Sequence, residues 1–264
     1  MRQLGLAFMQ YTEDNDETYP TGVITNLIEP GDPRGVLGMG WAGIIYPYVK
    51  STGAYNCPDD PTGLSRKNGA VIGYPVSYLF NTNAAEATLA QFNAPTNSVL
   101  LAEVRGDQAL ITDPSEGTNG YTTSAPSNLS GSQFQFSPAG DGLTSDITGL
   151  SLGTVSNIGP FGATFTSPDP YVKYDTGDLG SQFTVSTPLD FAGVDGRHTG
   201  GANFVAVDGH VKWLLPSHVS VGYNAPASDC TQNDTPPVAD CNGSVSIMAA
   251  GTSNSNYSLT FSKM

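Results

Sequence analysis

Residues 203–215, NFVAVDGHVKWLL, form two alternating runs of apolar side chains separated by Asp208 and Gly209. An Asp-Gly pair favours the positive φ values of a two-residue type I′ turn, so this stretch predicts a β-hairpin. The alternation directs Phe204 to one face of the hairpin and Val205 to the other. At least one of these faces should therefore pack on a hydrophobic core.

The start of the chain predicts a helix that could cover such a face. Apolar side chains recur at helical spacing at Leu4, Ala7, Phe8 and Tyr11. Because no N-cap residue precedes this stripe, we interpret it as the end of a longer helix whose hydrophobic part lies upstream. The helix should stop before Pro20, since the residue before a proline is disfavoured in the α region.

Three further segments predict ordered structure. Residues 41–49, WAGIIYPYV, fit either a short amphipathic helix or an irregular apolar segment, because Pro47 disfavours a long helix. The proline and aspartate content of residues 55–61, YNCPDDP, predicts a turn. Residues 72–81, IGYPVSYLFN, and 98–104, SVLLAEV, each predict a strand, the second one buried.

The remaining organisation follows from changes in composition. Residues 105–189 are dominated by Gly, Ser, Thr, Asn and Pro, which predicts an elaborated β-loop insertion, with a small β-subdomain as the alternative. Residues 1–19 then hold the helix and an acidic loop, and residues 20–104 the first part of a globular domain. Residues 190–264 hold the hairpin and a cysteine loop.

The composition restricts the class of protein. The 264 residues include 31 Gly and 19 Pro, and 13% are charged, which favours strands, turns and loops. A formal net charge of −14 would repel polyanions, so we expect no nucleic-acid partner. No run reaches the about 18 apolar residues of a membrane span, and the start is too polar for a signal peptide. This acidic composition is common in exported proteins, so we expect the export signal upstream.

The chain has three cysteines. Cys230 and Cys241 enclose a short polar loop with two prolines, which predicts a local disulfide of the kind that forms outside the cytoplasm. Cys57 is left over, either as a free thiol or as half of a pair whose partner is missing.

Two groups of acidic side chains are candidate calcium sites, because Ca²⁺ prefers oxygen ligands. The cysteine loop carries Asp229, Asp234 and Asp240. The loop after the N-terminal helix carries Asp14, Asp16 and Glu17. Neither group has the EF-hand spacing, so an acidic solubilising surface is the alternative.

Glu103 stands at the end of an apolar strand, so it should be partly buried and needs a partner. Arg197 and His198 are the candidates for that partner. We expect His198 to hydrogen-bond a neighbouring loop or the turn at Asp208 more than to act as a base or metal ligand.

Motifs of hydrolases, P-loop proteins and dinucleotide-binding enzymes are absent from the sequence, and Cys57 has no histidine nearby in the chain. We therefore expect a non-enzymatic protein, with a glycoside hydrolase that uses paired carboxylates as the enzymatic alternative. The carboxylates available for that reaction are Glu103, Asp190, Asp195 and Asp208, with His198 as a further catalytic candidate.

A glycan-binding module is a third interpretation, because aromatic side chains of the insertion could stack on sugars, although such side chains more often belong to a core. The aromatic candidates are Tyr121, Phe134, Phe161, Tyr171 and Tyr174.

Residues 197–214, RHTGGANFVAVDGHVKWL, place nine residues between His198 and the Asp208-Gly209 pair. This motif resembles the H-x(9)-D-G signature of the prepilin-type, processing-associated proteins, a bacterial family of type IV pilin-like proteins or pseudopilins. Residues 3–20 resemble the end of that family's long helix, and residues 41–60 resemble its W…YPYV-K…CP-[SD]-D segment. With the two strand segments, the resemblance covers about half of the chain.

The resemblance implies an α+β, pilin-like fold, with the N-terminal helix packed on an antiparallel sheet and a large β-rich insertion. It implies assembly with other pilin-like subunits through a hydrophobic half-helix, which lies in the membrane before assembly and in the filament core afterwards. The location would be extracellular or at the cell surface, and the role surface filament or secretion-system assembly. The family also commonly has a cysteine just upstream of the sequence around Leu4, which would offer Cys57 a partner. Pseudopilins use calcium in C-terminal loops, which favours the site at Asp229.

Overall fold

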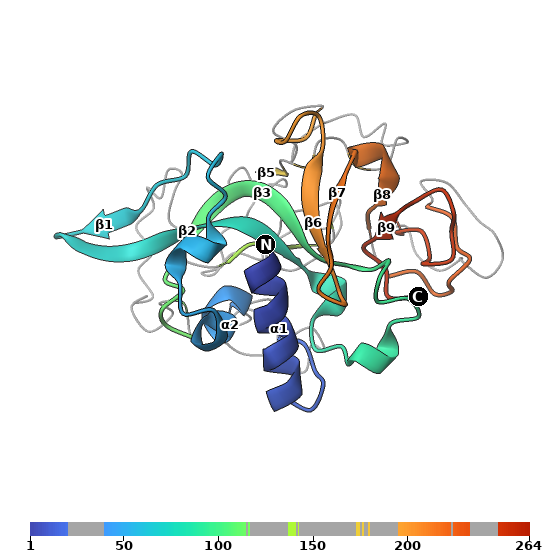
Figure 1. The fold of residues 1–264 in the computed structure, drawn as a ribbon, viewed down its shortest axis with the longest axis horizontal. Coiled ribbons are helices and arrows are strands. Elements are labelled where there is room, and N and C mark those ends of the chain that lie inside the picture. Colours follow the sequence, from blue (N-terminus) through green and yellow to red (C-terminus); the bar gives the residue numbers. More distant parts are fainter. Residues whose placement is uncertain are drawn as a thin grey trace, which may run out of the picture.

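The computed structural model describes residues 1–20, 40–114, 116, 137–140, 142, 173–174, 176, 179, 195–222, 224–232 and 248–264. These residues form a mixed α and β structure in which an N-terminal helix lies on an antiparallel sheet (Figure 1). The coarse architecture expected from the sequence is therefore confirmed.

The α-helices are α1 (Arg2–Asp14) and α2 (Trp41–Val49). The main sheet has the order β1 (Ser65–Lys67), β2 (Ala70–Asn81), β3 (Val99–Ala109), β6 (Ala202–Ala206) and β7 (Val211–Leu214), with neighbours antiparallel. β4 (Ala139–Gly140) pairs with β2, and β5 (Lys173–Tyr174) pairs with β3. β8 (Val219–Ser220) and β9 (Leu259–Thr260) form a separate parallel pair. Short 3-10 helices cover Thr52–Tyr55, Thr82–Ala84, Leu89–Gln91 and Pro216–His218.

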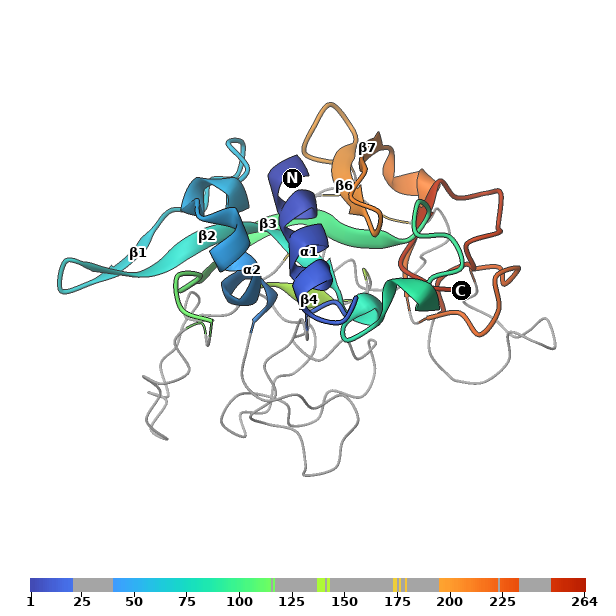
Figure 2. The same cartoon turned by 60° about the horizontal axis from the view of Figure 1, so that its bottom comes forward.

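The two α-helices cover one face of the sheet (Figure 2). Phe8 of α1 is fully buried and stacks on Trp41 of α2 and on Phe80 of β2, with ring centroids 5.6 and 5.5 Å apart. Gly5 brings α1 close to the hairpin, since a Cβ at this position would lie 3.2 Å from the carbonyl oxygen of Gly209. The apolar stripe of α1 is thus the face of the helix that is buried in the core.

The opposite face of the sheet packs on the C-terminal part of the chain. Phe204 of β6 and Ala102 of β3 belong to a second buried cluster with Val219, Leu259 and Phe261. The side chains on both faces of β6 are therefore buried, because Val205 belongs to the cluster under the helices.

Residues 41–49 form a helix despite Pro47, which lies near its C-terminal end. The carboxylate of Glu116 accepts hydrogen bonds from the backbone N–H of Gly43, in the first turn of α2, at 2.7 Å and from Ser137 N–H at 2.6 Å. The partial positive charge at a helix N-terminus favours a carboxylate in this place. Glu116, which lies in the segment expected to be an insertion, thus caps the N-terminus of α2.

The hairpin predicted around Asp208 and Gly209 is present as β6 and β7, but its predicted turn type is wrong. Of the two residues, only Gly209 has a positive φ, at 85°. The N–H of Ala206 donates to the carbonyl oxygen of His210 at 2.8 Å, and Gly209 N–H donates to Ala206 O at 2.9 Å. The connection therefore spans residues 207–209, and a three-residue loop needs positive φ only at its last residue.

The sheet continues into the region assigned to an insertion. β3 runs past residue 105 to Ala109, and the two-residue strands β4 and β5 also come from that region. Within the described ranges, neither α-helix has the length and apolar character needed to cross a lipid bilayer.

Candidate functional site

A cavity of about 770 Å³ lies between α1, the β6–β7 hairpin and the loop at Cys57. It is lined by Met1, Arg2, Leu6, Met9, Cys57, Pro58, Tyr78, Glu103, His198, Asn203, Asp208, Gly209, His210 and Val211. Among these residues, Cys57 and Glu103 contact the imidazole of His198, and local structure holds each of the three in place.

Residues 57–60, CPDD, form a tight turn, as predicted. The N–H of Asp60 donates to the carbonyl oxygen of Cys57 at 2.9 Å, and Pro58 stands at the second position, where its fixed φ favours such a turn. The N–H of Cys57 donates to Ser77 Oγ of β2 at 2.9 Å. The turn therefore holds the Cys57 thiol, which is buried, and presents the exposed carboxylate of Asp59 beside it.

His198 is presented by a second tight turn. Its N–H donates to Gly201 O at 2.8 Å, and Gly201 N–H donates back to His198 O at 3.1 Å. The two residues between them, Thr199 and Gly200, both have positive φ, at 57° and 82°. The indole Nε1–H of Trp213 also donates to His198 O, at 2.9 Å, so β7 holds the turn in place.

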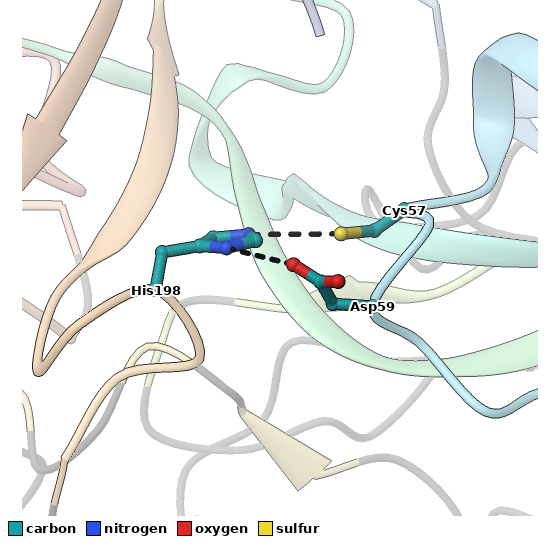
Figure 3. Close-up of side chains that lie close together, drawn as sticks. All are labelled: Cys57, Asp59 and His198. Atoms are coloured by element: carbon teal, nitrogen blue, oxygen red, sulfur yellow. Dashed lines mark hydrogen bonds and ion pairs between the residues drawn. The ribbon is translucent and has the colours of Figure 1, made fainter.

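The imidazole of His198 meets three side chains (Figure 3 shows two of them). Its Nε2 lies 3.0 Å from Glu103 Oε1 and 3.6 Å from Cys57 Sγ. Its Nδ1 lies 3.3 Å from Asp59 Oδ2. Both ring nitrogens thus face a carboxylate, and the nearest thiol lies beside Nε2.

Glu103 is 1% exposed, and His198 supplies the partner that burial of its carboxylate requires. Asn203 also donates to this carboxylate, from its backbone N–H at 2.8 Å and from Nδ2 at 3.1 Å. The other candidate partner, Arg197, instead donates to Val104 O at 2.9 Å and lies 3.7 Å from an Asp60 carboxylate oxygen.

The electrostatic environment of the site is negative. The pKa of Tyr78 is raised well above the usual phenol value by burial, and further by the neighbouring Cys57 and Glu103. Cations are therefore the ligands that this end of the cavity favours.

The carboxylates proposed for glycoside hydrolysis are only partly brought together. Glu103 and Asp208 line the same cavity as His198, whereas Asp195 is exposed and is not among the lining residues. His198 contacts Glu103 through Nε2 and the loop at Asp59 through Nδ1, whereas Asp208 pairs with His210. Asp190 lies outside the described residues.

The remaining candidates lie away from the cavity or outside the described part of the chain. Cys230 is disulfide-bonded, whereas Cys57 is a free thiol. Asp229 is exposed, and Asp14 accepts a hydrogen bond from Tyr48 at 3.1 Å. Outside the described residues lie Cys241, Asp234, Asp240, Tyr121, Phe134, Phe161 and Tyr171, and of Tyr174 only its backbone position in β5 is described. The predicted calcium sites therefore stay predictions.

Sequence reasoning missed the meeting of Cys57 and Asp59 with His198. The two turns are separated by 141 residues, and neither has ligand spacing within itself. The sequence offered one indication that the two turns meet, which is that both belong to segments that carry the family resemblance.

No protein-family model matches the chain, and comparisons with curated proteins and with solved structures find no match either.

Proposed function

We propose that the chain is the globular domain of a type IV pilin-like protein, or pseudopilin, that acts outside the cytoplasm in surface filament or secretion-system assembly. The observation that supports this proposal is that the three segments carrying the family resemblance meet at one place. They are residues 3–20, 41–60 and 197–214, and each belongs to a different element around the cavity.

Specific contacts join these segments. Gln3 Nε2–H of α1 donates to the carbonyl oxygen of Val49 in α2 at 3.2 Å. Gly5 of α1 approaches Gly209 in the hairpin, and His198 approaches Cys57 in the turn that follows α2. If the motifs define a single scaffold, motifs that lie far apart in the sequence should meet in one structural unit.

The surface of α1 also suits a subunit that assembles. Leu6 lies on the side of the helix away from Leu4 and Phe8 and is 59% exposed, and Val211 on the neighbouring β7 is 41% exposed. Both side chains line the cavity. In the proposed function this apolar surface contacts the helix of the next subunit, since exposed apolar groups often mark interaction surfaces.

The proposal requires a hydrophobic segment with a prepilin processing site encoded directly upstream of Met1. It also offers Cys57 a partner in a cysteine encoded there, because Met1 and Cys57 line the same cavity. Determining the upstream coding sequence tests the first requirement. Disulfide mapping of the chain expressed with that segment tests the second, and a reduced Cys57 in the exported protein would contradict the pairing.

Assembly is tested by a charge on the exposed side of α1. In cells that produce the protein with its upstream segment, Leu6→Asp should strongly reduce the amount recovered in sheared surface filaments or in the secretion complex. Leu64→Asp is the matched control, because Leu64 is 47% exposed but lies before β1, at the far end of the sheet from the hairpin. Equal recovery of the two variants at equal expression would contradict the proposal.

A further inference from the structure

We propose that Cys57, Asp59 and His198 form a binding site for a divalent cation of the zinc type, at the edge of the cavity beside α1. One ligand atom from each of the three side chains lies within 4.8 Å of the other two (Figure 3). This inference rests on the free thiol of Cys57 seen in the structure, so at this residue it is an alternative to the disulfide with an upstream cysteine and does not depend on filament assembly.

The chemical types of the three ligands select the ion. A thiolate, an imidazole and a carboxylate together suit Zn²⁺ or a similar borderline ion, whereas Ca²⁺ and Mg²⁺ prefer oxygen ligands alone. Tetrahedral zinc with bond lengths of about 2.0–2.3 Å separates its ligand atoms by about 3.3–3.6 Å. The distance of 3.3 Å from Asp59 Oδ2 to His198 Nδ1 is already within this range.

Glu103 determines which nitrogen of His198 is available. The buried carboxylate of Glu103 lies 3.0 Å from Nε2 of His198, and because an ionised carboxylate can only accept hydrogen bonds, it favours the tautomer with the proton on Nε2. With the proton on Nε2, the lone pair of Nδ1 faces Asp59. A carboxylate that orients the ring from its other nitrogen is the common arrangement for a histidine that binds zinc.

The lone pair of Nδ1 and the carboxylate of Asp59 repel each other at 3.3 Å unless a cation lies between them. The nearby guanidinium of Arg197 is directed to Asp60 and to the carbonyl oxygen of Val104, and so serves other groups. The thiol of Cys57, now 3.6 Å from Nε2, then completes a three-ligand set by turning toward the same cation. The adjoining cavity provides access to the fourth coordination position for water or an external ligand.

The scaffold around the ligands is rigid enough to hold such a site. Cys57 and Asp59 are two residues apart on one turn that is bonded to β2 through Ser77. His198 is fixed by its own two-residue turn and by Trp213. Ligands positioned by hydrogen-bonded turns lose little conformational entropy on metal binding, which favours affinity.

The test is metal binding by the purified 264-residue chain, with the Cys230 disulfide intact, Cys57 as a free thiol and metal removed with a chelator. Titration with Zn²⁺ against a chromogenic competitor should show one site per chain. Cys57→Ser, Asp59→Asn and His198→Gln should each weaken binding at least about tenfold, the smallest loss seen when a metal site is disturbed even at its supporting residues. Asp195→Asn is the matched control, because this exposed carboxylate precedes the His198 turn and is not part of the cluster.

Co²⁺ provides an independent readout. The wild-type chain should develop a thiolate-to-cobalt charge-transfer band in the near ultraviolet, and Cys57→Ser should not. Circular dichroism of each variant without metal separates lost binding from lost folding. If Zn²⁺ binds the wild-type and Cys57→Ser chains equally, or if Co²⁺ gives no such band, the site is refuted.

Discussion

Two buried glutamates lie in different regions and are stabilised in different ways. Glu103 lies at the hairpin site and is bonded by Asn203 and by a group that can carry positive charge, His198. Glu116 lies at the start of α2 and is bonded by neutral donors of Gly43 and Ser137. Burial raises the pKa of Glu116 to about 7, more than the hydrogen bonds that lower it can offset. Burial thus raises the pKa of the Glu116 carboxyl even though neutral donors bond both of its oxygens.

The largest effect is expected from Glu103→Ala. It leaves His198 and the N–H of Asn203 without their acceptor, and each buried polar group left unsatisfied costs about 1–3 kcal/mol. Urea unfolding of the metal-free chain measures this loss. In the double variant Glu103→Ala with His198→Ala the two losses should not add, because the partners share one interaction. Additive losses would mean that the contact contributes nothing to stability.

The next effect concerns the pH dependence of stability at Glu116. Its pKa is about 7 in the folded chain against an ordinary value of 4.5, so between these values the folded chain binds more protons than the unfolded chain. Its contribution to the unfolding free energy is therefore greatest below pH 4.5 and falls as the pH rises to 7, by at most about 3 kcal/mol.

Glu116→Gln cannot ionise, so its unfolding free energy should lack this decrease. The measurement is urea unfolding of both proteins across this pH range, and the difference between them isolates Glu116 from the other carboxylates. Parallel pH profiles of the two proteins would show that Glu116 ionises normally in the folded chain.

A smaller effect is expected from Ser137→Ala. The hydroxyl of Ser137 donates to Glu116 Oε1 at 2.9 Å, and its loss should cost about 1 kcal/mol at neutral pH. Because that hydrogen bond lowers the pKa of Glu116, its removal should also shift the decrease in stability to higher pH. The same unfolding series measures both quantities, and an unshifted profile would contradict the assigned contact.

The smallest effect is expected from Asp195→Asn. The side chain is exposed and is not part of the cavity lining, so the change in unfolding free energy should stay within about 0.5 kcal/mol. This variant also tests the glycoside hydrolase alternative. Any polysaccharide hydrolysis by the purified chain that Asp195→Asn abolishes would give this residue a catalytic role.

The sequence was most informative where a local pattern repeats the geometry of the element. The stripe containing Leu4 and Phe8 predicted α1, alternation predicted the strands β2, β6 and β7, and a continuous apolar run predicted β3. The need of Glu103 for a partner was also predictable, because a carboxylate in an apolar strand must be compensated. The turn type at Gly209 was not predictable from the sequence, because an Asp-Gly pair fits hairpin loops of both two and three residues.

The sequence by itself determined the N-terminal helix, the strands β2 and β3 and the hairpin of β6 and β7, because these depend on spacings of about two to four residues along the chain. Only the tertiary structure decided that the thiol of Cys57 and the carboxylate of Asp59 meet His198, and that Glu116 caps α2. Those contacts depend on how separate elements pack, and side-chain spacing along the chain carries no information about groups that sheet pairing brings together.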